Sequence, residues 1–525
     1  MAGHLFVIRG DITRLHCTAW ALPTDREARV EPGFLRHAPP GLRSERAAQL
    51  LDLDNSSQRA LRTRGVVRFG GWGGGPSVYL LDVGRLRANK PAWYVRRALA
   101  FIEQALADST SRDSRPLLAI PFIGSHKAGA SARKGDVADQ LVRALAERVG
   151  KTGPAVDVAL VAYSGAAFAA FQQVRRQLVD EGVDLWRELN PRLQKDADRL
   201  GDRAAGGDLV LFVGAGVSAA AGLPAWEDLL SKLSQRAHLS PSMQETFAGA
   251  QPPDQARLIA DELKLPRRDV GRVVASLMHA TRYAVPHALL ASLPVREVTT
   301  TNYDRLFEAA AEDAGSPVSV LPYERVKPGG RWLLKLHGTT EHPEDIVITR
   351  EDYLDYPLRR GALRGLVQGL LITKHMLFIG FSLQDENFIG IAHDVRVATH
   401  GSSRARRRFG TVLTLFPDEV RRRLWHRDLS TIAIDSKPEG DQTDESRRRA
   451  ARRLAIFLDR VAFRATPATL YLLDRTYEGV LGPDEKLLRE QLQNLGTQAS
   501  QVSPDSAAWR RIRTLLAEFG ANENR

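Results

Sequence analysis

A glycine-rich segment, DLVLFVGAGVSAAAGLP at residues 208–224, contains the residues of this chain that are best placed for chemistry. An apolar strand is expected to run into Gly214, Ala215 and Gly216, and a helix is expected to follow. Glycines at such a turn let the backbone approach a phosphate group, and the N terminus of the next helix offers unpaired N–H groups. The spacing departs from that of a standard dinucleotide site, because Ala219 occupies the third glycine position. The segment therefore indicates either nucleotide binding or a tight structural turn.

Polar residues follow a second predicted strand, in the segment VTTTNYDRLFEAA at residues 298–310. The carboxyl ends of parallel strands border the crevice in which α/β proteins bind their ligands. Thr300, Thr301, Asn302 and Asp304 are therefore candidates for ligand contact. One of them is also explained as the cap of the following helix, but capping accounts for a single residue. The four together favour a binding site.

Two more segments have an apolar strand that is followed by polar residues. In WLLKLHGTT (332–340), the strand ends at His337. Histidine is suited to general-base catalysis near neutral pH, although a single histidine is more often structural. In MLFIGFSLQDENF (376–388), the candidates at the strand end are Gly380, Ser382, Asp385 and Asn387. Four such turns from one sheet predict a nucleotide-binding crevice.

Residues 208–436 have the pattern of an α/β domain. Several of its strands lack period-two alternation, as expected where helices cover both faces of a parallel sheet. Six strands are predicted, at 209–213, 295–300, 332–336, 346–348, 375–381 and 412–416. Residues 229–284 have the pattern of short helices inserted after the first strand. We therefore predict a central, Rossmann-like parallel-sheet domain with a helical insertion.

The rest of the chain divides into three further regions. Residues 1–180 alternate strands and helices, and they predict a separate three-layer α/β module. Residues 181–207 are polar and helical, and they are expected to form a connector. Residues 437–525 are expected to form a helical C-terminal region. The fold class predicted for the chain is α/β.

The motifs GAGVSAAAGLP, TTNYD, KLHG and GFSL, in this order and spacing, resemble those of the sirtuin family of NAD-consuming enzymes. The resemblance covers about residues 205–435. It implies that His337 is the catalytic base and that Asn302 and Asp304 line the nicotinamide-ribose end of the site. It also implies that NAD is contacted by Gly214, Ala215, Gly216, Ser218, Thr301, Gly380 and Ser382.

The sequence departs from the deacylase sirtuins, and these departures indicate which branch of the family it resembles. Those enzymes carry a four-cysteine zinc module, but Cys17 is the only cysteine here, and no metal is expected. The pattern is more similar to the sirtuin-like NAD hydrolases of bacterial anti-phage systems such as Thoeris, whose activation depletes NAD. This implies hydrolysis of the nicotinamide–ribose bond, with NAD+ as the substrate. The alternatives are a sirtuin-type protein ADP-ribosyltransferase or deacylase coupled to an ADP-ribose reader, and a non-catalytic nucleotide sensor.

The N-terminal segment HLFVIRGDITRLHCTAWALPTD (4–25) resembles the start of a macrodomain, the α/β fold that binds ADP-ribose. The resemblance implies that Asp11 contacts adenine and that Gly124, Ser125 and Gly129 belong to a phosphate loop. Two roles are open for this macrodomain-like module. It is expected either to bind an ADP-ribose-type signalling nucleotide that activates NAD hydrolysis, or to act as a scaffold for assembly.

The net charge of the chain is +12, and its distribution indicates which kind of binding partner to expect. Residues 1–180 contain 26 basic and 16 acidic residues, so +10 of the charge lies there and +2 in the remainder. We therefore expect an anionic nucleotide as a partner, rather than nucleic acid. The single cysteine and the absence of an apolar run of about 18 residues predict a cytoplasmic protein without a membrane span. A homo-oligomer, and a partner protein from the defence system or the phage, are further expectations.

Overall fold

The structure is a computed structural model of the chain, and it divides into two compact units. Unit 1 comprises residues 1–187, 313–315 and 466–525, and unit 2 comprises residues 188–312 and 316–465. The structure describes residues 2–44, 48–84, 90–109, 115–124, 131–151, 153–237, 239, 243, 247, 249–264, 267–399, 408–436, 443–467, 469–499 and 506–521.

Unit 1 is built on a mixed sheet that contains eight strands among its described residues. The strands β1, β8, β7, β2 and β6 are parallel to their neighbours in this order, and β3, β4 and β5 are antiparallel. The strand bounds are β1 (Leu5–Arg9), β2 (Ala19–Thr24), β3 (Arg29–Val30), β4 (Gln49–Leu50), β5 (Val66–Phe69), β6 (Ser77–Asp82), β7 (Leu117–Pro121) and β8 (Asp157–Ala162).

Helices of unit 1 alternate with these strands along the chain. Their bounds are α1 (Asn55–Arg64), α2 (Pro91–Ala107), α3 (Lys134–Gly150) and α4 (Gly165–Asp180). Leu5 and Val7 of β1 pack into one core with α2, α3 and α4. Phe6 and Ile8 point to the opposite face and are buried as well, so the sheet is covered on both sides. The α/β class predicted for residues 1–180 is confirmed.

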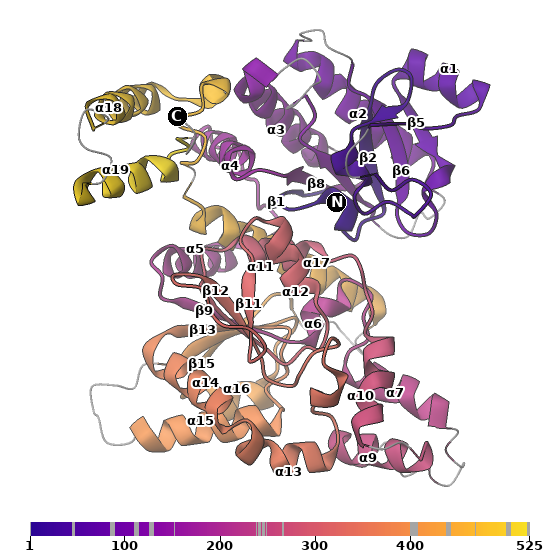
Figure 1. The fold of residues 1–525 in the computed structure, drawn as a ribbon, viewed down its shortest axis with the longest axis vertical. Coiled ribbons are helices and arrows are strands. Elements are labelled where there is room, and N and C mark those ends of the chain that lie inside the picture. Colours follow the sequence, from indigo (N-terminus) through magenta and orange to yellow (C-terminus); the bar gives the residue numbers. More distant parts are fainter. Residues whose placement is uncertain are drawn as a thin grey trace. The chain divides into compact units, whose positions relative to one another are not determined.

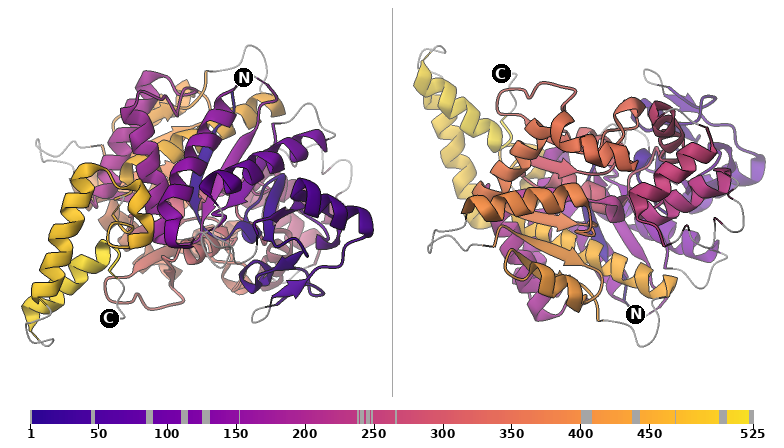
Figure 2. Two further views of the ribbon diagram at one scale, coloured as in Figure 1. Left: turned by 90° about the horizontal axis from the view of Figure 1, so that it is seen from above. Right: turned by 90° about the horizontal axis from the view of Figure 1, so that it is seen from below.

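The last part of the chain also belongs to unit 1. It contains α18 (Pro483–Ala499) and α19 (Ala507–Glu518), which lie side by side (yellow in Figure 2). Tyr471 and Tyr477 enter the core that α3 helps to form. The helix before them, α17 (Asp444–Ala465), lies in unit 2. The segment 437–525, predicted as one helical region, is thus divided between the two units.

Unit 2 is built on a fully parallel sheet with seven strands among its described residues (Figure 1). The strand order is β11-β12-β10-β9-β13-β14-β15. The bounds are β9 (Leu209–Val213), β10 (Glu297–Thr300), β11 (Val318–Leu321), β12 (Arg331–Lys335), β13 (His375–Ile379), β14 (Gly410–Thr414) and β15 (Leu429–Ala433). The chain passes from β9 to β10 on one side and later to β13 on the other, so the order reverses at β9. Ligands of such sheets bind at the carboxyl ends of the strands beside this reversal.

Helices cover the sheet of unit 2, and the predicted helical insertion is present. Helices α7 (Trp226–Ala237), α9 (Pro252–Glu262) and α10 (Arg267–Leu277) form it. The other helices are α5 (Pro191–Ala205), α6 (Ala215–Ala219), α11 (Val285–Ser292), α12 (Leu306–Asp313), α13 (Arg350–Arg359), α14 (Gly361–Thr373), α15 (Glu386–Thr399), α16 (Glu419–Trp425) and α17. No helix among the described residues is long and apolar enough to cross a membrane.

One predicted strand of unit 2 is wrong. Residues 346–348 are buried but form no strand. They precede α13, where the backbone N–H groups of Ile348 and Thr349 donate to Asp352 Oδ2. The apolar side chains are buried by packing against neighbouring elements. The Asp352 carboxylate accepts from the backbone N–H groups that would bond to a neighbouring strand if this segment were part of a sheet.

Candidate active site

The glycines of the first predicted motif bring two turns of unit 2 into contact. A Cβ on Gly214 would lie 2.4 Å from Gly380 O, and a Cβ on Gly216 would lie 2.8 Å from Gly380 Cα. Gly216 N–H donates to Gly380 O (2.9 Å), and Gly380 has a φ of +66°. Only glycine fits this approach without displacing the backbone. The turns after β9 and β13 therefore form one packed unit at the strand-order reversal.

Ser218, on the short helix α6, links the residues that follow β9 and β10. Its Oγ donates to Asp304 Oδ2 at 2.7 Å, and it accepts from Asn302 Nδ2 at 3.1 Å. The Asp304 carboxylate also accepts from Leu306 N–H through Oδ1 (2.9 Å), so it fixes the start of α12. Ser218, Asn302 and Asp304, predicted from separate motifs, thus lie in one hydrogen-bonded cluster.

A histidine that sequence reasoning missed completes this cluster. His287 is fully buried on α11, and its Nε2 lies 3.4 Å from Ser218 Oγ. Ala284 N–H donates to His287 Nδ1 (3.3 Å), so the ring proton is on Nε2 and faces the serine. Burial lowers the pKa of His287 to about 4, although the nearby Asp304 carboxylate raises it. The imidazole is therefore neutral near pH 7.

Asn302 is held so that one of its polar atoms remains available. Its Nδ2 donates to Gly214 O and to Ser218 Oγ, each at 3.1 Å. Its main-chain N–H donates to Thr300 Oγ1 (3.0 Å), and that hydroxyl donates to Val213 O (2.8 Å). Its Oδ1 is buried and has no hydrogen-bond partner among the described residues. A buried acceptor of this kind indicates a group supplied by water or a ligand.

His337 lies beyond the end of β12, in a second group of polar residues. It is buried, and its Nε2 lies 3.4 Å from Asp385 Oδ2 and 3.4 Å from Asn387 Nδ2. The rings of Tyr353 and Tyr356 approach its imidazole edge-to-face, with centroids at 5.7 and 5.9 Å. Burial lowers the pKa of His337, and Asp385 opposes that shift.

The loop that carries His337 runs beside the loop that carries Asn302. Leu336 N–H donates to Thr300 O, and Thr340 N–H donates to Tyr303 O, both at 2.9 Å. Tyr353 OH donates to Asp385 Oδ2 (3.1 Å), so this carboxylate has a fixed position against the imidazole. The two groups of residues border the same edge of the sheet.

Three of the predicted NAD contacts lie outside these clusters. Ala215 and Thr301 are half-buried, and the Thr301 hydroxyl forms no hydrogen bond with the described residues. Ser382 is exposed, and its hydroxyl accepts from Gln384 N–H (3.4 Å). Within the described part of the chain, no group of three His, Cys, Asp or Glu side chains could hold a metal ion.

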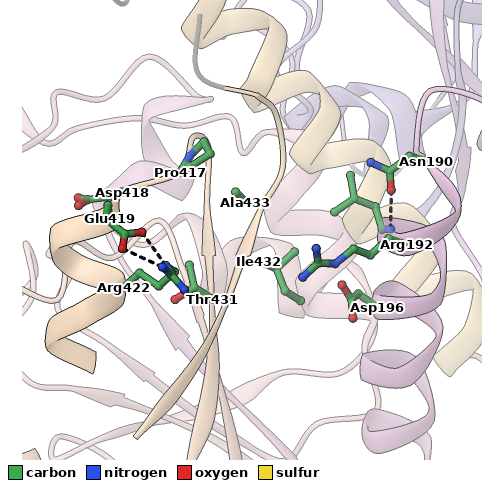
Figure 3. Close-up of a pocket in the computed structure, with 11 residues that line it drawn as sticks. Asn190, Arg192, Asp196, Pro417, Asp418, Glu419, Arg422, Thr431, Ile432 and Ala433 are labelled. Carbon is green, nitrogen blue, oxygen red and sulfur yellow. Dashed lines mark hydrogen bonds and ion pairs between the residues drawn. The ribbon is translucent and has the colours of Figure 1, made fainter. Parts of the chain in front are cut away.

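Two cavities of unit 2 lie away from the predicted residues. Their volumes are about 440 and 320 Å³, and both lie along β15 beside α5 and α16. Figure 3 shows the larger of the two. The two cavities share Arg192, Asp196 and Arg422 in their walls. Arg422 is paired with Glu419 at 2.7 Å, so one wall of this cleft is already neutralised.

The predicted nucleotide site of unit 1 is described only in part. Asp11 Oδ1 accepts from Thr13 N–H (2.9 Å) and from Thr13 Oγ1 (2.7 Å), and Oδ2 lies 3.7 Å from His37 Nε2. Gly124 has a φ of +81°, and a Cβ there would meet the ring of Tyr94 at 2.9 Å. Ser125 and Gly129 lie outside the described residues.

Comparison with known proteins identifies the class of the central domain. Residues 296–432 match the SIR2-like domain family. This match agrees with the sirtuin resemblance of the motifs that lie within it. The matched range contains Asn302, Asp304, His337 and Gly380, whereas the glycine turn after β9 precedes it.

Particular relatives are similar to part of the chain. NAD(+) hydrolase ThsA of Bacillus cereus (strain MSX-D12) is 30% identical over 195 residues, covering 36% of this chain and 40% of the relative. NAD(+) hydrolase ThsA of Enterococcus faecium is 27% identical over 290 residues, covering 50% of this chain and 60% of the relative. Defense-associated sirtuin 2 of Bacillus subtilis is 27% identical over 206 residues, covering 36% of this chain and 19% of the relative. The chain thus spans less than two thirds of the length of each of these relatives.

Among solved structures, the Oceanobacillus iheyensis macrodomain with MES bound is similar to part of the chain. The match has 14% sequence identity and covers 34% of this chain and 93% of that protein. Its TM-score is 0.26. We therefore assign unit 1 to the α/β class from its strand order and not from this similarity.

Proposed function

We propose that this protein hydrolyses the nicotinamide–ribose bond of NAD+ to give nicotinamide and ADP-ribose. The observation that carries the proposal is Asn302, whose amide nitrogen is fixed by two hydrogen bonds while its Oδ1 is buried without a partner. A ribose hydroxyl or the attacking water would donate to this oxygen. The SIR2-like domain and the names of the matched relatives support NAD+ as the substrate.

The reaction needs the site to hold the ribose and to admit one water. The bond between ribose C1′ and the pyridinium nitrogen breaks, and its electron pair leaves with nicotinamide. The water oxygen then forms a bond to C1′ and releases one proton. Fixing the ribose and the water in line lowers the entropic part of the barrier. The rigid Asn302 amide would perform this orientation.

His337 would accept the released proton. Its pKa is lowered by burial, so the imidazole is neutral near pH 7 and can act as a base. The Asp385 carboxylate, 3.4 Å from Nε2, would then stabilise the imidazolium cation. Asp304 would act through Ser218, to which it is hydrogen-bonded, and would keep the Asn302 amide in place.

The remaining predicted contacts would bind the rest of NAD+. Gly214, Ala215, Gly216 and Ser218 would border the phosphates, and Thr301 would line the ribose end. Gly380 and Ser382 would approach the adenosine half. The close packing of the two glycine turns supports this arrangement, because it leaves main-chain groups rather than side chains at the reversal of strand order.

We further propose that the reaction serves anti-phage defence in the cytoplasm, as an abortive-infection effector, and that unit 1 controls it. In this proposal a macrodomain-like module binds an ADP-ribose-type nucleotide through Asp11 and the phosphate loop of Gly124, Ser125 and Gly129. The ligand must bind the active state more tightly than the resting state. Assembly into a homo-oligomer and a partner defence or phage protein would complete the control. A rise in NAD+ hydrolysis on adding cyclic ADP-ribose-type nucleotides, absent in Asp11→Ala, is the expected result.

The catalytic proposal is tested with purified protein, NAD+ and no protein acceptor. We expect free nicotinamide and ADP-ribose from the wild type and none above background from His337→Ala. His393→Ala is the matched control, because His393 is an exposed histidine on α15. Circular dichroism of each variant checks that it is folded.

Two results would contradict this proposal, one for the reaction and one for the role of His337. Turnover only with an acetylated or unmodified acceptor protein would indicate a deacylase or an ADP-ribosyltransferase. Equal rates in the wild type and in His337→Ala would remove His337 from the mechanism.

A further inference from the structure

We propose that Lys335, paired with Glu308, is a positioning residue for the Asn302 loop; this inference rests on the proposed NAD+ hydrolysis. Lys335 is the last residue of β12 and is 1% exposed. Its Nζ lies 2.9 Å from Glu308 Oε1 and donates to Asn302 O at 3.3 Å and to Asp304 O. An ammonium group has three N–H donors, and these three acceptors use all of them.

The loop needs such a partner because it leaves the sheet at this point. The β10 ladder ends at Thr300, which is in register with Lys335. The main-chain carbonyl groups of Asn302 and Asp304 therefore have no neighbouring strand to supply donors. The Lys335 ammonium supplies them, while the side chains of the same two residues bind Ser218 on α6. The loop is thus held through its main chain from β12 and through its side chains from α6.

A role in the ion pair alone does not account for this geometry. A buried Lys–Glu pair is often no more stabilising than an apolar pair of similar volume, since both charges must be desolvated. Here two of the three donors of Lys335 go to the residues on either side of Tyr303, which carry the candidate catalytic groups. Glu308 Oε2 has no hydrogen-bond partner among the described residues, so Lys335 is the main restraint on that carboxylate. The Lys335 ammonium group therefore fixes the loop that carries Asn302 and Asp304.

The test substitutes Lys335→Met, which keeps an unbranched side chain and removes the ammonium. We expect kcat to fall roughly 10- to 100-fold with KM changed less than about threefold, because a small displacement of an orienting group lowers the rate strongly. Hydrogen exchange gives a second measurement that does not depend on catalysis. The N–H groups of Asn302 and Leu306 are bound within the loop, and their exchange should become at least about tenfold faster.

A matched control separates positioning from a general loss of stability. Asp435 is also buried in unit 2 and accepts from Arg453 Nη1 at 2.6 Å, but it contacts none of the loop residues. Asp435→Asn should lower the melting temperature and leave kcat and the exchange of residues 301–306 unchanged. Glu308→Gln, which keeps an acceptor for Lys335, should lower kcat less than Lys335→Met does. This variant also tests the proposal if Lys335→Met fails to fold.

Two outcomes overturn the inference. One is a Lys335→Met enzyme with kcat within about twofold of the wild type. The other is faster exchange spread evenly over β9, β13 and β14 rather than confined to residues 301–306. If the wild type releases no nicotinamide, the proposed function fails, but the exchange experiment still decides whether Lys335 fixes the loop.

Discussion

The loop after β10 in unit 2 and the loop after β1 in unit 1 both place a carboxylate beyond the end of a parallel strand, but they leave different atoms for a ligand. In unit 2, Asp304 binds neighbouring donors and thereby holds Asn302, whose Oδ1 stays buried and unpaired. In unit 1, Asp11 accepts twice from Thr13 and caps a short 3-10 helix. The comparison shows that a polar residue at a strand end keeps an atom for a ligand when a second residue, rather than the polar residue itself, fixes the turn.

The largest effect should come from removing the free acceptor. Asn302→Ala deletes Oδ1, and we expect a loss of NAD+ hydrolysis on the order of 100-fold or more, as for other groups that orient a reacting centre. Asn302→Asp keeps an oxygen there but places a second one against Gly214 O, so it should be inactive as well. Nicotinamide release measured by chromatography checks both. A fully active Asn302→Ala would show that the unpaired Oδ1 in the loop of unit 2 is not needed for the reaction.

The two units should also respond differently to acid. The pKa of His287 is about 4 in the folded protein and near 6.5 when unfolded, so the unfolded chain binds the proton first. Its stabilising contribution is complete above pH 6.5 and is lost as the pH falls toward 4, by at most about 3 kcal/mol. His37 in unit 1 has a side chain that is 35% exposed, compared with the fully buried His287, and it should contribute less.

Urea unfolding at pH 7.0 and 5.0 measures this contrast. Wild type should lose more stability between the two pH values than His287→Leu does. Equal losses in the two proteins would mean that the imidazole buried beside Ser218 is not linked to folding.

The smallest effect on stability is expected at Asp11. Asp11→Ala removes the acceptor for Thr13 and should lower the free energy of unfolding of unit 1 by about 1 kcal/mol, as the loss of a cap does. Thermal melting followed by hydrogen exchange of residues 10–15 would detect it. Asp11→Asn keeps an acceptor and should be closer to the wild type. A loss far above this value would indicate that Asp11 supports more than its own turn.

The sequence predicted the central strands β9 and β13 of unit 2 because their residues are apolar on both faces. It missed the edge strands β11 and β15, where polar residues such as Ser319 and Thr431 lower the signal. An edge strand has one neighbour and one open side, so its composition is less restricted. The helical insertion was predicted because the hydrophobic periodicity of each helix is contained in a short stretch of sequence.

The candidate site was predictable where its residues follow strands. Asn302, Asp304 and His337 were found in this way, and the structure places them at one edge of the sheet. His287 and Glu308 were missed because they lie on helices and meet the site through tertiary packing. Nothing in the spacing of His287 and Ser218, 69 residues apart, indicates their contact.

The interlocked turns of Gly214, Gly216 and Gly380 affect how related sequences should be interpreted. Any side chain at these positions would collide with main-chain atoms of the opposite turn, whether or not a nucleotide is present. A descendant that had lost the proposed activity would therefore still retain the three glycines in order to fold. In a newly sequenced genome, the glycine pattern identifies the architecture, whereas an intact Asn302 is the more informative sign of the proposed activity.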